Sequence, residues 1–297
     1  MENLWEPVCG LYSSTASLFP CLGWLNNFGN SSLFTTLFGA LAGAYAGAWA
    51  AQRIAAKSKL QEELLREIRS TNSALLLAQA IFNIGLSSKV HSALPLKTAY
   101  EEEVKIFKEN PEDFTEKLKG PVNLERVTCA TMPISALHPL VLTEISSSVG
   151  AVRALLHLKI AVDSHLDALA NRNGIIELFI NKTLPRGLKF EDMYFGEPRE
   201  GVTHRGYPDS IRDIYTTADD IIFFSKKLCE SLHLHAMELR DRYRRVSKNR
   251  VTISKLVIDP NIDPSLIPGD DSYSKWVAGY QPTHTKVTVP WWRRWRK

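Results

Sequence analysis

Residues 33–52 read LFTTLFGALAGAYAGAWAAQ, an apolar run that contains no charged side chain. The charge-free region is longer still, since no Asp, Glu, Lys or Arg lies between Glu6 and Arg53. Charged residues make up 23% of the 297-residue chain, so about ten charges would be expected over this length. Their absence indicates a segment that lies where charge is costly, as in the hydrocarbon core of a membrane.

The charge-free region divides into two apolar segments, 7–25 and 33–52, joined by an Asn- and Gly-rich stretch typical of a turn. Each segment is close to the ~20 residues that a helix needs to cross a ~30 Å hydrocarbon core. The sequence therefore predicts a transmembrane helical hairpin. Two alternatives stay open: a single span with the N-terminus outside, and an apolar segment of a soluble protein. The acidic start of the chain does not fit a cleaved signal peptide, which begins with basic residues.

Basic residues after the second segment predict its orientation. Arg53, Lys57 and Lys59 follow the segment directly and are expected on the cytoplasmic side. With a hairpin the short N-terminus is cytoplasmic as well. We therefore expect an inner-membrane protein whose bulk lies in the cytoplasm.

The second segment carries glycine at every fourth position. Gly39, Gly43 and Gly47 share one helical face, which forms two overlapping GxxxG units, or a glycine zipper. Such a face lets two helix backbones approach closely in lipid. Its partner is either the first span or another copy of the chain, so self-association and a pore are among the expectations. Trp49 lies near the cytoplasmic end and is expected at the membrane interface.

The remainder of the chain predicts an all-α fold. Apolar residues recur at three- and four-residue spacing over 138–172 and 210–248, and a continuous helix is expected over 33–86, ending before Pro95. Residues 250–258 alone look strand-like. The expected domains are a membrane hairpin (1–52), a cytoplasmic helical domain (53–258) and an irregular tail (259–297).

The helical domain carries no recognisable catalytic motif. It has no P-loop, GxGxxG, HExxH, GxSxG or paired CxxC sequence. The chain's four cysteines are isolated, and two of them lie in the apolar segments, so no metal, cofactor or catalytic residue is predicted. One weak enzymatic signal remains: Arg199 and His204 have the spacing found in HEPN-type ribonucleases. They lie among Gly and Pro residues, whereas that motif belongs on a helix.

Two basic stretches lie late in the chain. The first is a basic patch for which three interpretations stay open: a solvated helix end, a nucleic-acid surface or a surface for anionic lipid. It contains Arg240, Arg242, Arg244, Arg245, Lys248 and Arg250. The second combines Trp with Arg and is expected to touch the membrane interface, with nucleic acid as the alternative. It contains Trp291, Trp292, Arg293, Arg294, Trp295 and Arg296.

This order of parts resembles the two-span transmembrane effectors of bacterial antiphage systems, in particular those of retrons. The resemblance covers residues 7–52 and the helix at 53–86, and no single residue's role is carried over from it. It implies an abortive-infection effector that is restrained by a partner, such as a reverse transcriptase ribonucleoprotein, and that damages the inner membrane on release. Alternatives are a membrane-tethered scaffold or sensor that binds a protein or nucleic acid, and a membrane-anchored HEPN-like ribonuclease.

Overall fold

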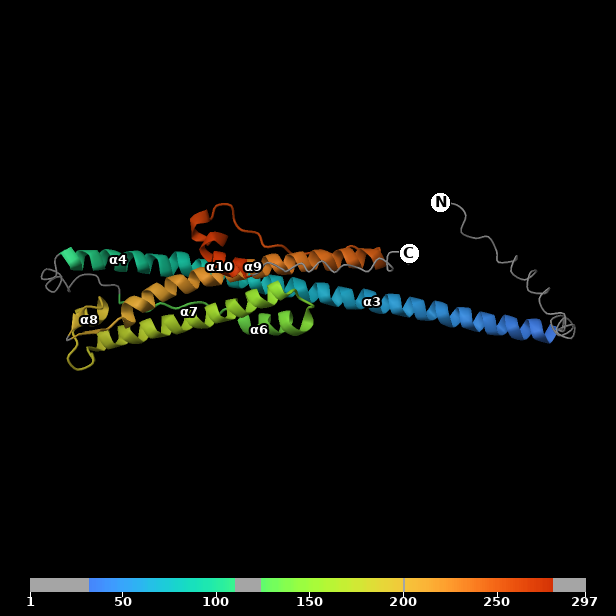
Figure 1. Ribbon diagram of the computed structural model, residues 1–297, viewed down its shortest axis with the longest axis horizontal. Coiled ribbons are helices and arrows are strands. Elements are labelled where there is room, and N and C mark those ends of the chain that lie inside the picture. The colour runs from blue at the N-terminus through green and yellow to red at the C-terminus, as the bar shows by residue number, and fades with distance from the viewer. Residues whose placement is uncertain (1–31, 110–123, 200, 280–297) are drawn as a thin grey trace. The chain divides into compact units, whose positions relative to one another are not determined.

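The structure, a computed structural model, describes residues 32–109, 124–199 and 201–279 (Figure 1). The chain divides into two compact units, Met1–Glu62 and Glu63–Lys297. The described part of the first unit is the beginning of one helix, α3 (Ser32–Ser88). The expected first span (7–25) and the Trp/Arg tail lie outside the described residues.

The described chain is mostly helical, as the sequence predicts. Helix α3 continues through a π-helix, η2 (Lys89–Ala93), into α4 (Leu94–Glu109). The other main helices are α7 (Val149–Asn181) and α9 (Gly206–Val246), which lie side by side in Figure 1. The shorter elements are α6 (Ile134–Pro139), η3 (Leu140–Glu144), α8 (Phe190–Tyr194), η4 (Pro264–Leu266), η5 (Asp270–Tyr273) and α10 (Ser274–Ala278). A two-residue antiparallel pair joins β1 (Pro198–Arg199) and β2 (Val202–Thr203), with Pro198 opposite Thr203.

The core of the second unit is a bundle in which α9 runs antiparallel to both the later half of α3 and α7. For α7, the His157 ring stacks on Phe224 and the Phe179 ring contacts Tyr207. For α3, Leu64 packs near Tyr243 and Phe82 packs near Ile222. Gly85 is required at this crossing, because a Cβ there would lie 2.6 Å from a methyl group of Ile221. Apolar residues of α3, α6, α7 and α9 complete the main core cluster, and Tyr273 and Trp276 pack against it.

The prediction that the first long helix ends before Pro95 is wrong. Pro95 is the second residue of α4, and the helix passes it by way of the π turn. There the Leu94 N–H donates to the Lys89 carbonyl, five residues back. The wider turn accommodates a ring that would clash with the preceding turn of a regular α-helix.

The predicted helix at 138–172 is wrong at its start, while the one at 210–248 is confirmed as α9. The chain breaks between η3 and α7 because a run of serines binds neighbouring polar groups in place of the helical ladder. The Ser146 N–H donates to the Glu67 carboxylate, and the Ser147 hydroxyl donates to the Val141 carbonyl. Ser148 then caps α7 by accepting from the Ala151 N–H at 3.2 Å.

The strand-like stretch at 250–258 forms no strand but lies extended along the bundle. Asn72 of α3 takes the place of a neighbouring strand: its side-chain amide donates to the Thr252 carbonyl at 2.9 Å and accepts from the Ser254 N–H at 3.0 Å. Val251 and Ile253 pack beside Tyr243. The segment therefore closes the bundle without a sheet.

Candidate functional site

Every residue from 36 to 60 of α3 is exposed. These include large apolar side chains, such as Tyr45 at 76% and Leu41 at 59% of full exposure. Gly39, Gly43 and Gly47 all lie on this segment, and a Cβ at any of them would meet nothing within 4 Å. The predicted glycine face is therefore present on a helix and open to a partner.

Trp49 and Arg53 lie together at the end of the apolar segment. The Arg53 guanidinium stands 3.9 Å from the centre of the Trp49 ring, a cation–π contact. An aromatic ring followed by a cation is the pairing that marks the boundary between hydrocarbon and headgroups in membrane helices. The interfacial place of Trp49 stays a prediction.

The described chain has one helix, Thr36–Glu109, that is long and apolar enough to cross a membrane by length and composition. The 18-residue stretch of this helix that is apolar enough has 44% of its residues buried. No residue from 36 to 60 is buried, so this stretch lies in the packed half of α3. The exposed half includes many Ala and Gly residues, which add little to membrane insertion. Composition alone therefore leaves both a membrane helix and the core helix of a soluble protein open.

The basic patch lies at the end of α9 and on the chain that follows it. Arg242, Arg244, Arg245, Lys248 and Arg250 are exposed. Arg240 is half-buried and lies 3.6 Å from the Asp241 carboxylate. The structure thus brings the six predicted residues together on one end of the bundle.

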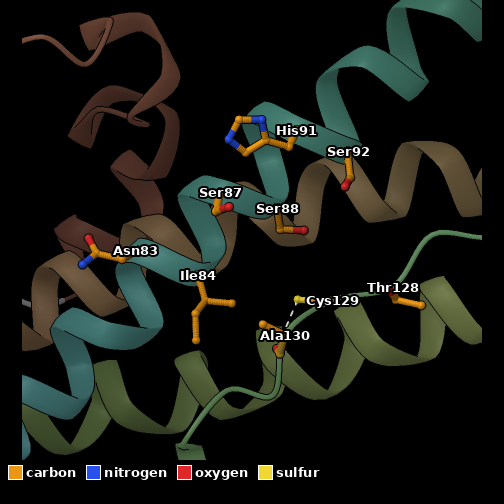
Figure 2. Close-up of a pocket in the computed structure, with 9 residues that line it drawn as sticks. All are labelled: Asn83, Ile84, Ser87, Ser88, His91, Ser92, Thr128, Cys129 and Ala130. Atoms are coloured by element: carbon orange, nitrogen blue, oxygen red, sulfur yellow. Dashed lines mark hydrogen bonds between the residues drawn. The ribbon is translucent and has the colours of Figure 1, made fainter.

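A cavity of about 280 Å³ opens beside the π-helix, where α3 faces the extended chain at 128–130 (Figure 2). Hydroxyl, amide, imidazole and thiol groups line it, together with Ile84 and Ala130. The polar lining residues are Asn83, Ser87, Ser88, His91, Ser92, Thr128 and Cys129. Burial raises the pKa of the Cys129 thiol, which lowers its reactivity. The lining therefore presents hydrogen-bonding groups and contains no Asp, Glu, Lys or Arg.

Behind the cavity, Ser88 begins a hydrogen-bonded chain that joins three helices. The Thr217 hydroxyl donates to the Asp213 carbonyl at 2.7 Å, so it accepts from Nδ1 of His165 at 2.9 Å. Nε2 of His165 then accepts from the Ser88 hydroxyl at 3.1 Å. Burial lowers the pKa of His165 to about 4. A neutral imidazole thus links α3, α7 and α9.

A buried ion pair stands next to this chain. Lys89, the first residue of the π-helix, is 3% exposed, and its Nζ lies 2.5 Å from the Asp219 carboxylate. The same ammonium group donates to the Leu266 carbonyl at 2.8 Å. Through these contacts Lys89 holds the segment around Leu266 against the bundle at the π turn.

No protein-family model, curated protein or solved structure matches this chain.

Arg199 and His204, the pair with ribonuclease-like spacing, lie on and just after the small β hairpin. The Arg199 guanidinium donates to the Asp192 carboxylate at 2.9 Å. The same carboxylate accepts from the Lys189 N–H and so begins α8. Arg199 therefore has a structural partner, which ties the hairpin to α8. Among the described residues, no group of three His, Cys, Asp or Glu side chains is placed to hold a metal ion.

Sequence reasoning missed Lys89, His165, Thr217 and Asp219. They lie on three helical segments that are far apart along the chain, and no known motif combines them. The only local signal is the pair of serines before Lys89, which follows a largely apolar stretch at 74–86. Their partnership depends on how α3, α7 and α9 cross.

Proposed function

We propose that the chain is a membrane-embedded effector of a bacterial antiviral system. In this scheme the exposed half of α3 inserts in the inner membrane and associates through its glycine face, while the helical body lies in the cytoplasm. The observation that supports it is the exposure of every side chain from 36 to 60 on a helix that continues into a packed body. Covering one Leu or Phe side chain is worth about 1.5–3 kcal/mol, so this surface favours lipid or another helix over water.

The glycine face supplies the association step. Ala and Gly favour insertion only weakly, so a helix of this composition gains stability by packing against a partner. The first apolar segment, 7–25, is one candidate partner within a hairpin, and a second copy is the other. Assembly of several copies would disturb the permeability barrier of the membrane.

The helical body is the part of the chain through which a partner restrains the membrane segment. A regulatory partner, protein or ribonucleoprotein, binds the helical body and holds the silent form, and its loss releases the membrane segment to assemble. To keep the active form rare, the partner must favour the silent form by several kcal/mol.

The test is induction of the intact chain alone in a bacterium, read with a potential-sensitive dye and a growth curve. Gly43→Leu fills the glycine face, and Ala48→Leu, on the opposite face, is the matched control. Depolarisation and arrest that Gly43→Leu abolishes and Ala48→Leu keeps, at equal membrane abundance, are expected. Normal potential and growth from a well-inserted chain would overturn the effector mechanism.

A second candidate is a membrane-tethered scaffold or sensor, which the cavity beside the π-helix favours. In that case residues 33–52 serve only as an anchor. Exchange of this segment for an unrelated membrane helix separates the two functions: a scaffold keeps its activity, and the effector loses it.

A further inference from the structure

The last turns of α9 pack against the first buried residues of α3. Leu239 and Tyr243 form one cluster with Leu64 and Ile68. Because α9 runs antiparallel to α3, its final residue, Val246, lies at the end of the bundle where the packed part of α3 begins. The chain then turns and returns along the bundle, held by Asn72. The end of α9 and this turn therefore form the tip of the body, at the end of the bundle where the packed part of α3 begins.

Cations dominate this tip. The basic patch holds six Arg or Lys residues from 240 to 250, and the only acidic residue in that interval is Asp241. Arg66 and Arg69 of α3 are exposed at the same end, although Arg66 pairs with Glu144 at 2.8 Å. Glu62 and Glu63 add negative charge on α3 but leave the excess of cations in place.

We infer that this tip binds the anionic headgroups of the bilayer in which α3 is embedded. The inference rests on the proposed membrane insertion of α3 and adds a second contact with the same membrane. Lys and Arg near an anionic leaflet each strengthen binding about fivefold. Docking of the tip would fix the tilt of the body against the membrane surface.

Headgroups fit the tip better than nucleic acid does. Proteins that bind single strands stack bases on exposed aromatic rings. Between residues 239 and 258 the one aromatic residue is Tyr243, which is buried at 4% exposure. The patch thus offers cations for phosphate groups and no platform for bases.

The experiment places the full chain in nanodiscs of phosphatidylcholine, with or without phosphatidylglycerol, and measures hydrogen exchange of residues 242–258. The test variant reverses three charges of the tip. It is Arg242→Glu/Arg244→Glu/Arg245→Glu. A matched control reverses three exposed charges at the other end of α9 and α7. It is Lys182→Glu/Arg186→Glu/Arg205→Glu.

Phosphatidylglycerol is expected to slow exchange of the tip at least about fivefold. High salt should remove the effect, because the Debye length falls from about 10 Å at 0.1 M to about 3 Å at 1 M. The tip variant should lose the protection and the control should keep it. Equal exchange in both lipids, from a chain that has entered the discs, overturns the inference and leaves the proposed function standing.

Two other outcomes would also overturn the inference that the tip binds lipid headgroups. A chain that does not enter the discs overturns the proposed membrane insertion and this inference with it. Protection of the tip by a single-stranded RNA oligonucleotide, where phosphatidylglycerol gives none, assigns the patch to nucleic acid and overturns lipid binding.

Discussion

Acid should destabilise the helical body through His165. The imidazole is fully buried between Ser88 and Thr217, and burial lowers its pKa to about 4, against about 6.5 in an unfolded chain. Protons therefore bind the unfolded chain more tightly than the folded one. The stability that the neutral ring provides is complete above about pH 6.5 and is lost as the pH falls toward 4.

The size of the loss follows from the two pKa values. Between about pH 7 and pH 5, linkage gives a decrease of about 2 kcal/mol in the free energy of unfolding, and about 3 kcal/mol when the ring is fully protonated. His157 also has a lowered pKa, mainly through burial and then through Arg153, and acts in the same direction. A comparison with His165→Gln, which keeps hydrogen-bonding capacity without titrating, isolates the contribution of His165.

Unfolding of the body can be followed by chemical labelling of the Cys229 thiol. This thiol is completely buried in the body's core, so a reagent labels it when the body unfolds. Pulse labelling with dithiodipyridine in a urea series, with mass spectrometry to locate the labelled peptide, gives the free energy of unfolding at each pH. The wild type should lose about 2 kcal/mol more than His165→Gln between about pH 7 and pH 5. Equal losses in the two proteins would refute the assignment to His165.

Three further changes test the packing of the body by the same assay. Gly85→Ala should cost about 1–3 kcal/mol, because the added Cβ meets α9 at 2.6 Å, whereas Gly174→Ala, with open space around it, should stabilise the helix by up to about 1 kcal/mol. Equal effects would contradict the close crossing. Lys89→Met should cost about 3 kcal/mol, since it leaves the Asp219 carboxylate unpaired, and Asp219→Asn should recover part of that loss in the double variant. A loss that is additive in the double variant would argue against the pair. Asn72→Ala removes two hydrogen bonds to the segment at 250–258 and should speed hydrogen exchange there severalfold, with about 1–2 kcal/mol lost. Unchanged exchange would show that the segment is held by its apolar contacts.

The sequence predicted the helical class and two long helices well, because both signals are local. Apolar residues at three- and four-residue spacing predict α9 to within four residues of its observed ends. The uncharged run around Gly43 predicts a helix with no charged face, and its residues 36–52 are helical and exposed in the structure. Its place in a membrane and its glycine-mediated assembly stay predictions.

Tertiary structure decided which polar residues of different helices lie opposite one another. The path past Pro95 depends on a π turn, and Lys89 and His165 find their partners only because α3, α7 and α9 cross at that level. Periodicity reports which face of one helix is apolar, but it carries no information on which polar residue of another helix will stand opposite. The basic patch illustrates both contributions. Composition identified its residues, and the packing of Tyr243 against Leu64 placed them at the end of the bundle where the packed part of α3 begins.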